Sequence, residues 1–150
     1  MDEIEYKYLS YQENRDVVFV LGAGASHPDG VPLQKHILPL ILNDKEIAES
    51  EIGRSVIEFI KDNYKFNIEK DLYPDLESVF GFLDYFIQQN ETLSVKYTVQ
   101  GIRQIKESLI KLIHHVVNKN ADKSSKVYHQ FWEAIKGYNS NISILTLNYD

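Results

Sequence analysis

Two short apolar runs lie near opposite ends of the chain, and each leads directly into small or polar residues. The first, Asp16–Leu21, precedes Gly22-Ala-Gly-Ala-Ser26. The second, Ile142–Leu147, precedes Asn148-Tyr-Asp150. The first run is apolar at almost every position, which predicts a strand buried on both faces. Because ligands of open parallel α/β sheets bind at the carboxyl ends of the strands, both following segments are candidate binding loops.

Between the two predicted strands, apolar residues recur at helical spacing, which predicts a mainly helical region over residues 33–138. The first helix covers Leu33–Leu42, and Pro39 should kink or shorten it. Four further apolar stripes follow this helix: Ile52, Val56, Phe59 and Ile60; Leu76, Val79, Phe80, Leu83, Phe86 and Ile87; Ile102, Ile105, Leu109, Leu112, Ile113 and Val116; and Val127, Phe131, Ala134, Ile135 and Tyr138. The third of these stripes is long and could begin near Thr92, and the fourth ends close to Gly137.

The distance between the two strands predicts an insertion. Roughly 120 residues separate them, far more than the single crossover helix that parallel strands require. We therefore expect an α/β fold with a parallel sheet and a large helical insertion between its first two recognisable strands. Residues 1–15 are polar with scattered tyrosines and are expected to form an N-terminal arm or a short helix.

The amino-acid composition excludes several classes of function for this chain. The 150 residues carry a net charge of −6, so the surface as a whole should repel nucleic acid. There is no cysteine, which excludes disulfides, a thiolate zinc site and a cysteine nucleophile within these residues. No apolar stretch approaches the ~18 residues that span a bilayer, and the acidic N-terminus does not look like a signal peptide, so we expect a cytoplasmic protein.

The glycine-rich loop suits a phosphate ligand. Gly22 and Gly24 permit tight turning and close approach of a ligand to the main chain, and amides of the following helix would face a diphosphate. The ordinary dinucleotide fingerprint fails, because His27 stands where its third glycine belongs, and a P-loop lacks its Gly-Lys-Ser/Thr. The alternative is a strand-to-helix turn that merely needs small residues.

The second loop suits a sugar or a positioned water. Thr146, Asn148 and Asp150 alternate at the end of the strand, where amide and carboxylate oxygens can meet ribose hydroxyls. The alternative is that Asn and Asp end the strand because they favour turns.

Together, in this order, the two loops resemble those of the SIR2-like (sirtuin) superfamily, whose hallmarks are Gly-Ala-Gly-x-Ser and Thr-x-Asn-x-Asp. Gly22-Ala-Gly-Ala-Ser26 matches the first and Thr146-Leu-Asn-Tyr-Asp150 the second, while Gly30-Val-Pro32 looks like the following Gly-x-Pro. Pro74–Phe80 looks like the helical insertion of bacterial members. The resemblance implies that residues 16–150 are the N-terminal part of such a domain, with a Rossmann-like parallel sheet that is incomplete in this chain.

The resemblance also implies an activity. Deacylases of the superfamily continue with Asp-Phe-Arg where this chain has Leu33-Gln-Lys35, which favours the bacterial branch of NAD⁺ hydrolases in phage defence. The catalytic histidine of the family would lie beyond residue 150, so the 150 residues alone are expected to be inactive. Asn148 and Asp150 would be catalytic, and no metal is implied. The residues that would bind NAD⁺ are Gly22, Ala23, Gly24, Ser26, Pro32 and Thr146.

Other readings remain open. The fold could bind or sense NAD⁺ or ADP-ribose, or scaffold a complex, without catalysis. The expected partners are a second copy of the chain or another defence protein, and neither nucleic acid nor a membrane. Among the histidines, His27 lies in the glycine loop and could touch a ligand. Those at helical positions are more often surface or core residues: His36, His114, His115 and His129.

Overall fold

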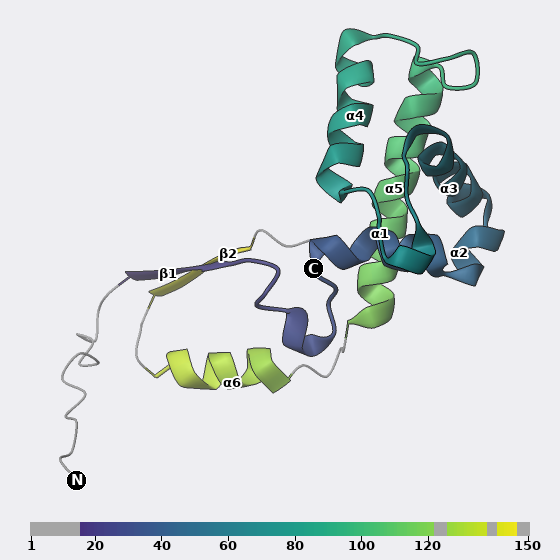
Figure 1. The fold of residues 1–150 in the computed structure, drawn as a ribbon. Helices are drawn as coiled ribbons and strands as arrows, with labels where there is room; N and C mark the ends of the chain where they lie inside the picture. Colours follow the sequence, from purple (N-terminus) through teal and green to yellow (C-terminus); the bar gives the residue numbers. More distant parts are fainter. Residues whose placement is uncertain (1–15, 122–125, 138–140, 147–150) are drawn as a thin grey trace. The chain divides into compact units, whose positions relative to one another are not determined.

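The computed structural model describes residues 16–121, 126–137 and 141–146. They form two compact units, which we describe separately. The strand unit comprises the described residues up to Gly30 together with those from 126 to 146, and the helical unit comprises Val31–Ala121. The described residues contain six α-helices and one two-stranded parallel sheet, so the fold is mixed α/β as expected (Figure 1). No helix among them is long and apolar enough to cross a membrane.

The strand unit contains the parallel sheet. Strand β1 (Asp16–Leu21) pairs in parallel with β2 (Asn141–Thr146), in a register that runs from Asp16 opposite Asn141 to Leu21 opposite Thr146. Helix α6 (Lys126–Ile135) packs on this sheet, because the Phe131 ring meets Phe19 of β1 edge-on with centroids 5.0 Å apart. The expected parallel sheet is confirmed, and β1 and β2 are neighbours in it.

The expectation that β1 is buried on both faces is wrong. Its residues alternate between half-buried and exposed, with Val18 64% and Val20 60% exposed. Leu145, which pairs with Val20, lies on the same face and is 53% exposed. Helix α6 covers only the Phe19 face, and no other described helix of eight or more residues belongs to the strand unit. A run of consecutive aliphatic residues is compatible with either arrangement, so the pattern could not distinguish them.

The helical unit is built around its longest helix. Helix α5 (Val99–Asn120) packs against α1 (Gln34–Asn43), α3 (Glu51–Asn63) and α4 (Leu76–Gln89), as Figure 1 shows. The predicted apolar stripes supply the buried core, which confirms the helical reading of this region. The largest fully buried side chains are Phe59, Ile37, Leu38, Ile41, Ile60, Leu83, Ile102, Leu109 and Ile113.

Helix ends differ from the sequence prediction where capping decides them. Helix α5 begins at Val99 rather than near Thr92, because the Thr98 hydroxyl accepts a hydrogen bond from Gly101 N at 3.2 Å. Helix α2 (Lys45–Glu49) was not expected, since five residues are too few to show a stripe. It starts where the Asp44 carboxylate accepts from Glu46 N and Ile47 N at 2.8 and 3.1 Å. A short 3₁₀ turn, η3 (Ile68–Lys70), precedes α4.

Pro39 does not shorten α1, which continues through it to Asn43. Proline has no N–H, so the α-helical hydrogen bond to the Lys35 carbonyl is missing at this turn. The last turn is held by the Asn43 side-chain amide, which donates to Pro39 O of the same helix at 2.9 Å and to the Tyr73 hydroxyl outside it at 2.8 Å.

Gly53 provides a test of the packing between α2 and α3. A Cβ built on it would overlap the Ile47 carbonyl and lie 2.7 Å from Ser50 Oγ. Gly53→Ala should therefore lower the free energy of unfolding by about 1–3 kcal/mol, measured by thermal or urea unfolding. Gly81→Ala in α4 is the matched control, because its Cβ would meet nothing within 4 Å. It should raise the stability by about 0.5–1 kcal/mol through helix propensity. Equal effects of the two substitutions would contradict this packing.

Candidate functional site

The sheet register brings two of the sequence-predicted segments to one edge. Leu21 lies opposite Thr146, and Gly22 follows Leu21 directly. The glycine loop and the end of β2 therefore share the carboxyl edge of the sheet, where α/β proteins bind ligands. Thr146 is exposed there. Asn148 and Asp150, the two predicted catalytic residues, lie outside the described residues.

The glycine loop turns twice before the chain leaves the strand unit. Ala25 N donates to Gly22 O at 2.8 Å, and Asp29 N donates to Ser26 O at 3.0 Å. The second turn is η2 (His27–Asp29), a single 3₁₀ turn ended by Gly30 in the left-handed region at φ 86°. The next long helix, α1, begins at Gln34, after the predicted loop. The contact of a diphosphate with amides of the following helix stays a prediction.

The backbone conformation at positions 22 and 24 does not require glycine. Gly30 is the glycine with a positive φ in the described chain, and a Cβ at Gly22 or Gly24 would meet nothing within 4 Å. Tight turning, one of the two reasons proposed for these glycines, therefore does not explain them. The open space beside both residues leaves room for a ligand to approach the main chain closely.

Some of the remaining predicted site residues are exposed, and others are buried. Ala23 is exposed, as is His27, whereas Ser26 has no exposed surface. A ligand at the loop surface thus meets Gly22, Ala23 and Gly24 rather than Ser26 in this conformation. Pro32 is buried and belongs to the helical unit, so the two units supply different predicted residues.

The helical histidines match the surface reading. His114 and His115 on α5 and His129 on α6 are exposed, and His36 is half-buried on α1. Within the described ranges, no group of three or more His, Cys, Asp or Glu side chains is placed to hold a metal ion.

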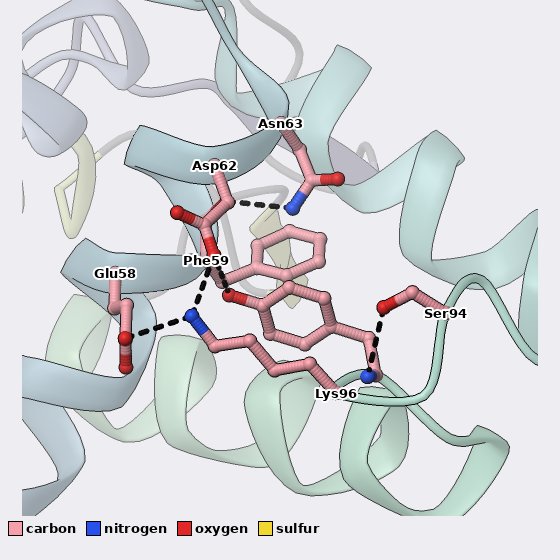
Figure 2. Close-up of polar contacts among 7 residues, drawn as sticks. Glu58, Phe59, Asp62, Asn63, Ser94 and Lys96 are labelled. Atoms are coloured by element: carbon pink, nitrogen blue, oxygen red, sulfur yellow. Dashed lines mark hydrogen bonds and ion pairs between the residues drawn. The ribbon is translucent and has the colours of Figure 1, made fainter.

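A polar cluster of Glu58, Asp62, Lys96 and Tyr97 was missed by the sequence analysis. Figure 2 shows the Lys96 ammonium between two carboxylates, 2.7 Å from Glu58 and 2.6 Å from Asp62. The Tyr97 hydroxyl also donates to Asp62, at 2.7 Å, and the Tyr97 ring meets Phe59 edge-on at 5.2 Å. The cluster fixes the segment before α5 onto α3. Its partners are 34 to 38 residues apart, so no local sequence pattern reveals it.

The charges of this cluster shift the pKa values of its members. Hydrogen bonds from Lys96 and then Tyr97 hold the pKa of the Asp62 carboxyl below its usual range. The same contact with Asp62, followed by that with Glu58, raises the pKa of Lys96. Burial, followed by the Asp62 contact, raises the pKa of the Tyr97 hydroxyl. Because all these shifts stabilise the charge states already present at neutral pH, the cluster has the properties of a structural anchor.

Two concave sites lie in the helical unit. A cavity of about 420 Å³ lies between the first turns of α1 and the segment 71–76. A shallower groove of about 490 Å³ lies between α3 and α5, beside Lys96. None of the predicted site residues lines either of them. The cavity beside α1 is formed by segments distant in sequence, so the pattern of the chain gave no sign of it.

Comparison with known proteins adds no relative: no family model matches the chain, and neither a curated protein nor a solved structure matches it.

The open space beside Gly24 predicts that Gly24→Ala leaves the free energy of unfolding unchanged, or raises it by up to about 1 kcal/mol through a less flexible unfolded chain. Gly30→Ala in the same loop is the control. Its left-handed backbone should make alanine cost about 1–2 kcal/mol. Urea unfolding of both variants checks this, and a large loss of stability in Gly24→Ala would contradict the described loop.

The lowered pKa of Asp62 predicts a specific pH dependence. A carboxyl whose pKa is lowered on folding contributes stability above its unfolded value, here 3.8, and loses it as the pH falls through the folded value. The melting temperature of Asp62→Asn should therefore lie below that of the wild type at about pH 6, and the difference should shrink below pH 3.8.

Glu107→Gln on the exposed surface of α5 is the control for this pH series, because the Glu107 side chain forms no hydrogen bond or ion pair with a described residue. It should show no such convergence with the wild type. If the gap between Asp62→Asn and the wild type instead stays constant or widens in acid, the Lys96 contact does not stabilise the fold.

Proposed function

We propose that this chain is part of a SIR2-like domain with a Rossmann-like parallel sheet, and that the domain binds NAD⁺ and cleaves its nicotinamide–ribose bond. The observation that carries the proposal is the pairing of Leu21 with Thr146. It supports a common site for the Gly-Ala-Gly-x-Ser and Thr-x-Asn-x-Asp segments, which lie far apart in the sequence and are the hallmarks of that superfamily.

The glycine loop is the proposed diphosphate site. The exposed backbone at Gly22, Ala23 and Gly24 has free space beside it, so a phosphate can approach the main chain closely. Backbone amides can hold such an anion although the protein carries a net charge of −6. Thr146, at the end of the neighbouring strand, is the proposed contact toward the ribose.

The roles of Asn148 and Asp150 follow from the resemblance. In the proposed reaction, the bond between C1′ of the ribose and the nicotinamide nitrogen breaks, and a water molecule adds to C1′ and releases a proton. The products are nicotinamide and ADP-ribose. Asn148 positions the ribose or the attacking water, and Asp150 holds ribose hydroxyls. The histidine that the resemblance implies would serve as the general base or hold a ribose hydroxyl.

The setting proposed from the resemblance is bacterial phage defence in the cytoplasm, with a second copy or another defence protein as partner. A second candidate function is binding of NAD⁺ or ADP-ribose without cleavage. It rests on the same exposed backbone at Gly22, Ala23 and Gly24, which can hold a diphosphate whether or not the ligand is cleaved.

NAD⁺ consumption by the longest natural form of the protein tests the proposal, with nicotinamide and ADP-ribose measured as products. We expect cleavage by the wild type and a loss of at least about 100-fold in Asn148→Ala, because a positioned reactant is lost. Asn118→Ala, on the exposed surface of α5, is the matched control and should cleave like the wild type. Equal cleavage by Asn148→Ala and the wild type would refute the assigned role.

The same protein distinguishes the second candidate. Calorimetric binding of NAD⁺ without turnover, weakened at least about tenfold by Gly24→Val, would assign a binding or sensing module. Absence of both cleavage and binding would overturn the strand-edge site altogether.

A further inference from the structure

The cavity between α1 and the segment 71–76, here called the α1 cavity, has the size and shape of a small-molecule site. Its volume is about 420 Å³, within the range typical of ligand pockets. One wall is the first half of α1, and the other is the chain between η3 and α4. Both walls belong to the helical unit, so the cavity does not depend on how the two units are arranged.

The wall opposite α1 is held in place by several contacts. Asn67 and Leu72 exchange two backbone hydrogen bonds, of 2.8 and 2.9 Å, just before the wall begins. The Tyr73 hydroxyl accepts from the Asn43 amide, and the Asp75 carboxylate caps α4 by accepting from Ser78 N at 3.0 Å. With Pro74 between them, these contacts make the cavity preformed, which reduces the entropy lost when a ligand binds.

Charges of opposite sign line the two walls without meeting. Lys35 stands on the α1 wall, and Asp71 and Asp75 stand on the other. In the part of the chain that the structure describes, none of these three side chains takes part in an ion pair. Other lysines of that part, by contrast, do form ion pairs with carboxylates, namely Lys96, Lys106 and Lys119. A ligand with one positive and one negative group would satisfy both walls of the cavity.

The lining also has an apolar part. Pro39, Tyr73 and Pro74 line the cavity and are half-buried, whereas Leu38 and Leu76, which also line it, are almost fully buried. The half-buried apolar surface matches a hydrocarbon side chain, and the carboxylates of Asp71 and Asp75 match a primary ammonium.

We propose that the α1 cavity binds a free α-amino acid with an apolar side chain. The carboxylate of the ligand lies toward Lys35, its ammonium lies toward Asp71 and Asp75, and its side chain packs on Pro39, Tyr73 and Pro74. None of the described residues proposed to bind NAD⁺ lines this cavity, and the inference does not depend on the proposed reaction.

Calorimetric titration of the full chain with L-leucine and L-phenylalanine tests the site. At least one of them should bind with a Kd below about 10 mM. Two analogues of leucine each lack one charge: 4-methylpentanoate has no ammonium, and 3-methylbutylamine has no carboxylate. Each should bind at least about fivefold more weakly, because one partly exposed charge pair is lost.

Variants localise the binding. Lys35→Met and Asp71→Asn should each weaken binding at least about fivefold while leaving the melting temperature unchanged. Lys45→Met is the control, because Lys45 is exposed on α2 and does not line the cavity. The proposal is overturned if neither amino acid binds below about 10 mM, if either singly charged analogue binds as well as leucine, or if Lys35→Met binds like Lys45→Met.

Discussion

The parallel pairing of β1 with β2 is the constraint on which the candidate site depends. Leu21 and Thr146 are opposite each other although the whole helical region lies between them in the chain. Closing so long a connection costs little more entropy than closing a short one, since the cost grows only with the logarithm of its length. The intervening residues also form a core of their own around α5, so the connection is itself folded. Without this pairing, the two motif segments would have no common edge.

The helices of the region between the two strands were largely predictable, because the spacing of apolar residues that indicates a helix lies within a short stretch of sequence. The apolar stripes of α3, α4 and α5 follow the 3.6-residue period, and most of their positions are buried, although Ile52 of α3 is exposed. The stripe of α6 contains no buried residue among those described. Helix ends were less predictable, because a single cap decides them, as Thr98 does for α5. The continuation of α1 through Pro39 depends on Asn43 and Tyr73, a contact across 30 residues that no local pattern contains.

The strand region was harder, because burial of a strand depends on what packs on it. The sequence of β1 is nearly all aliphatic, yet Val18 and Val20 are exposed since α6 covers one face only. In the candidate site, too, the sequence predicted some features and not others. The motif spacing predicted a shared strand edge, which the register provides, but not the burial of Ser26 or the short turn η2. The α1 cavity and the Lys96 cluster arise from long-range contacts, so they became visible only in the structure.

Disulfide trapping of the paired strands tests the central claim most directly. The chain contains no cysteine, so an introduced pair has no competing thiol. Val20 and Leu145 are register partners on the exposed face of the sheet, within the distance that a disulfide bridges. The double variant Val20→Cys/Leu145→Cys should therefore oxidise readily to an intramolecular disulfide, whereas Val18→Cys/Leu145→Cys, two residues out of register, should not. Equal oxidation of both pairs, or oxidation of neither, would contradict the parallel register that joins the two motif segments.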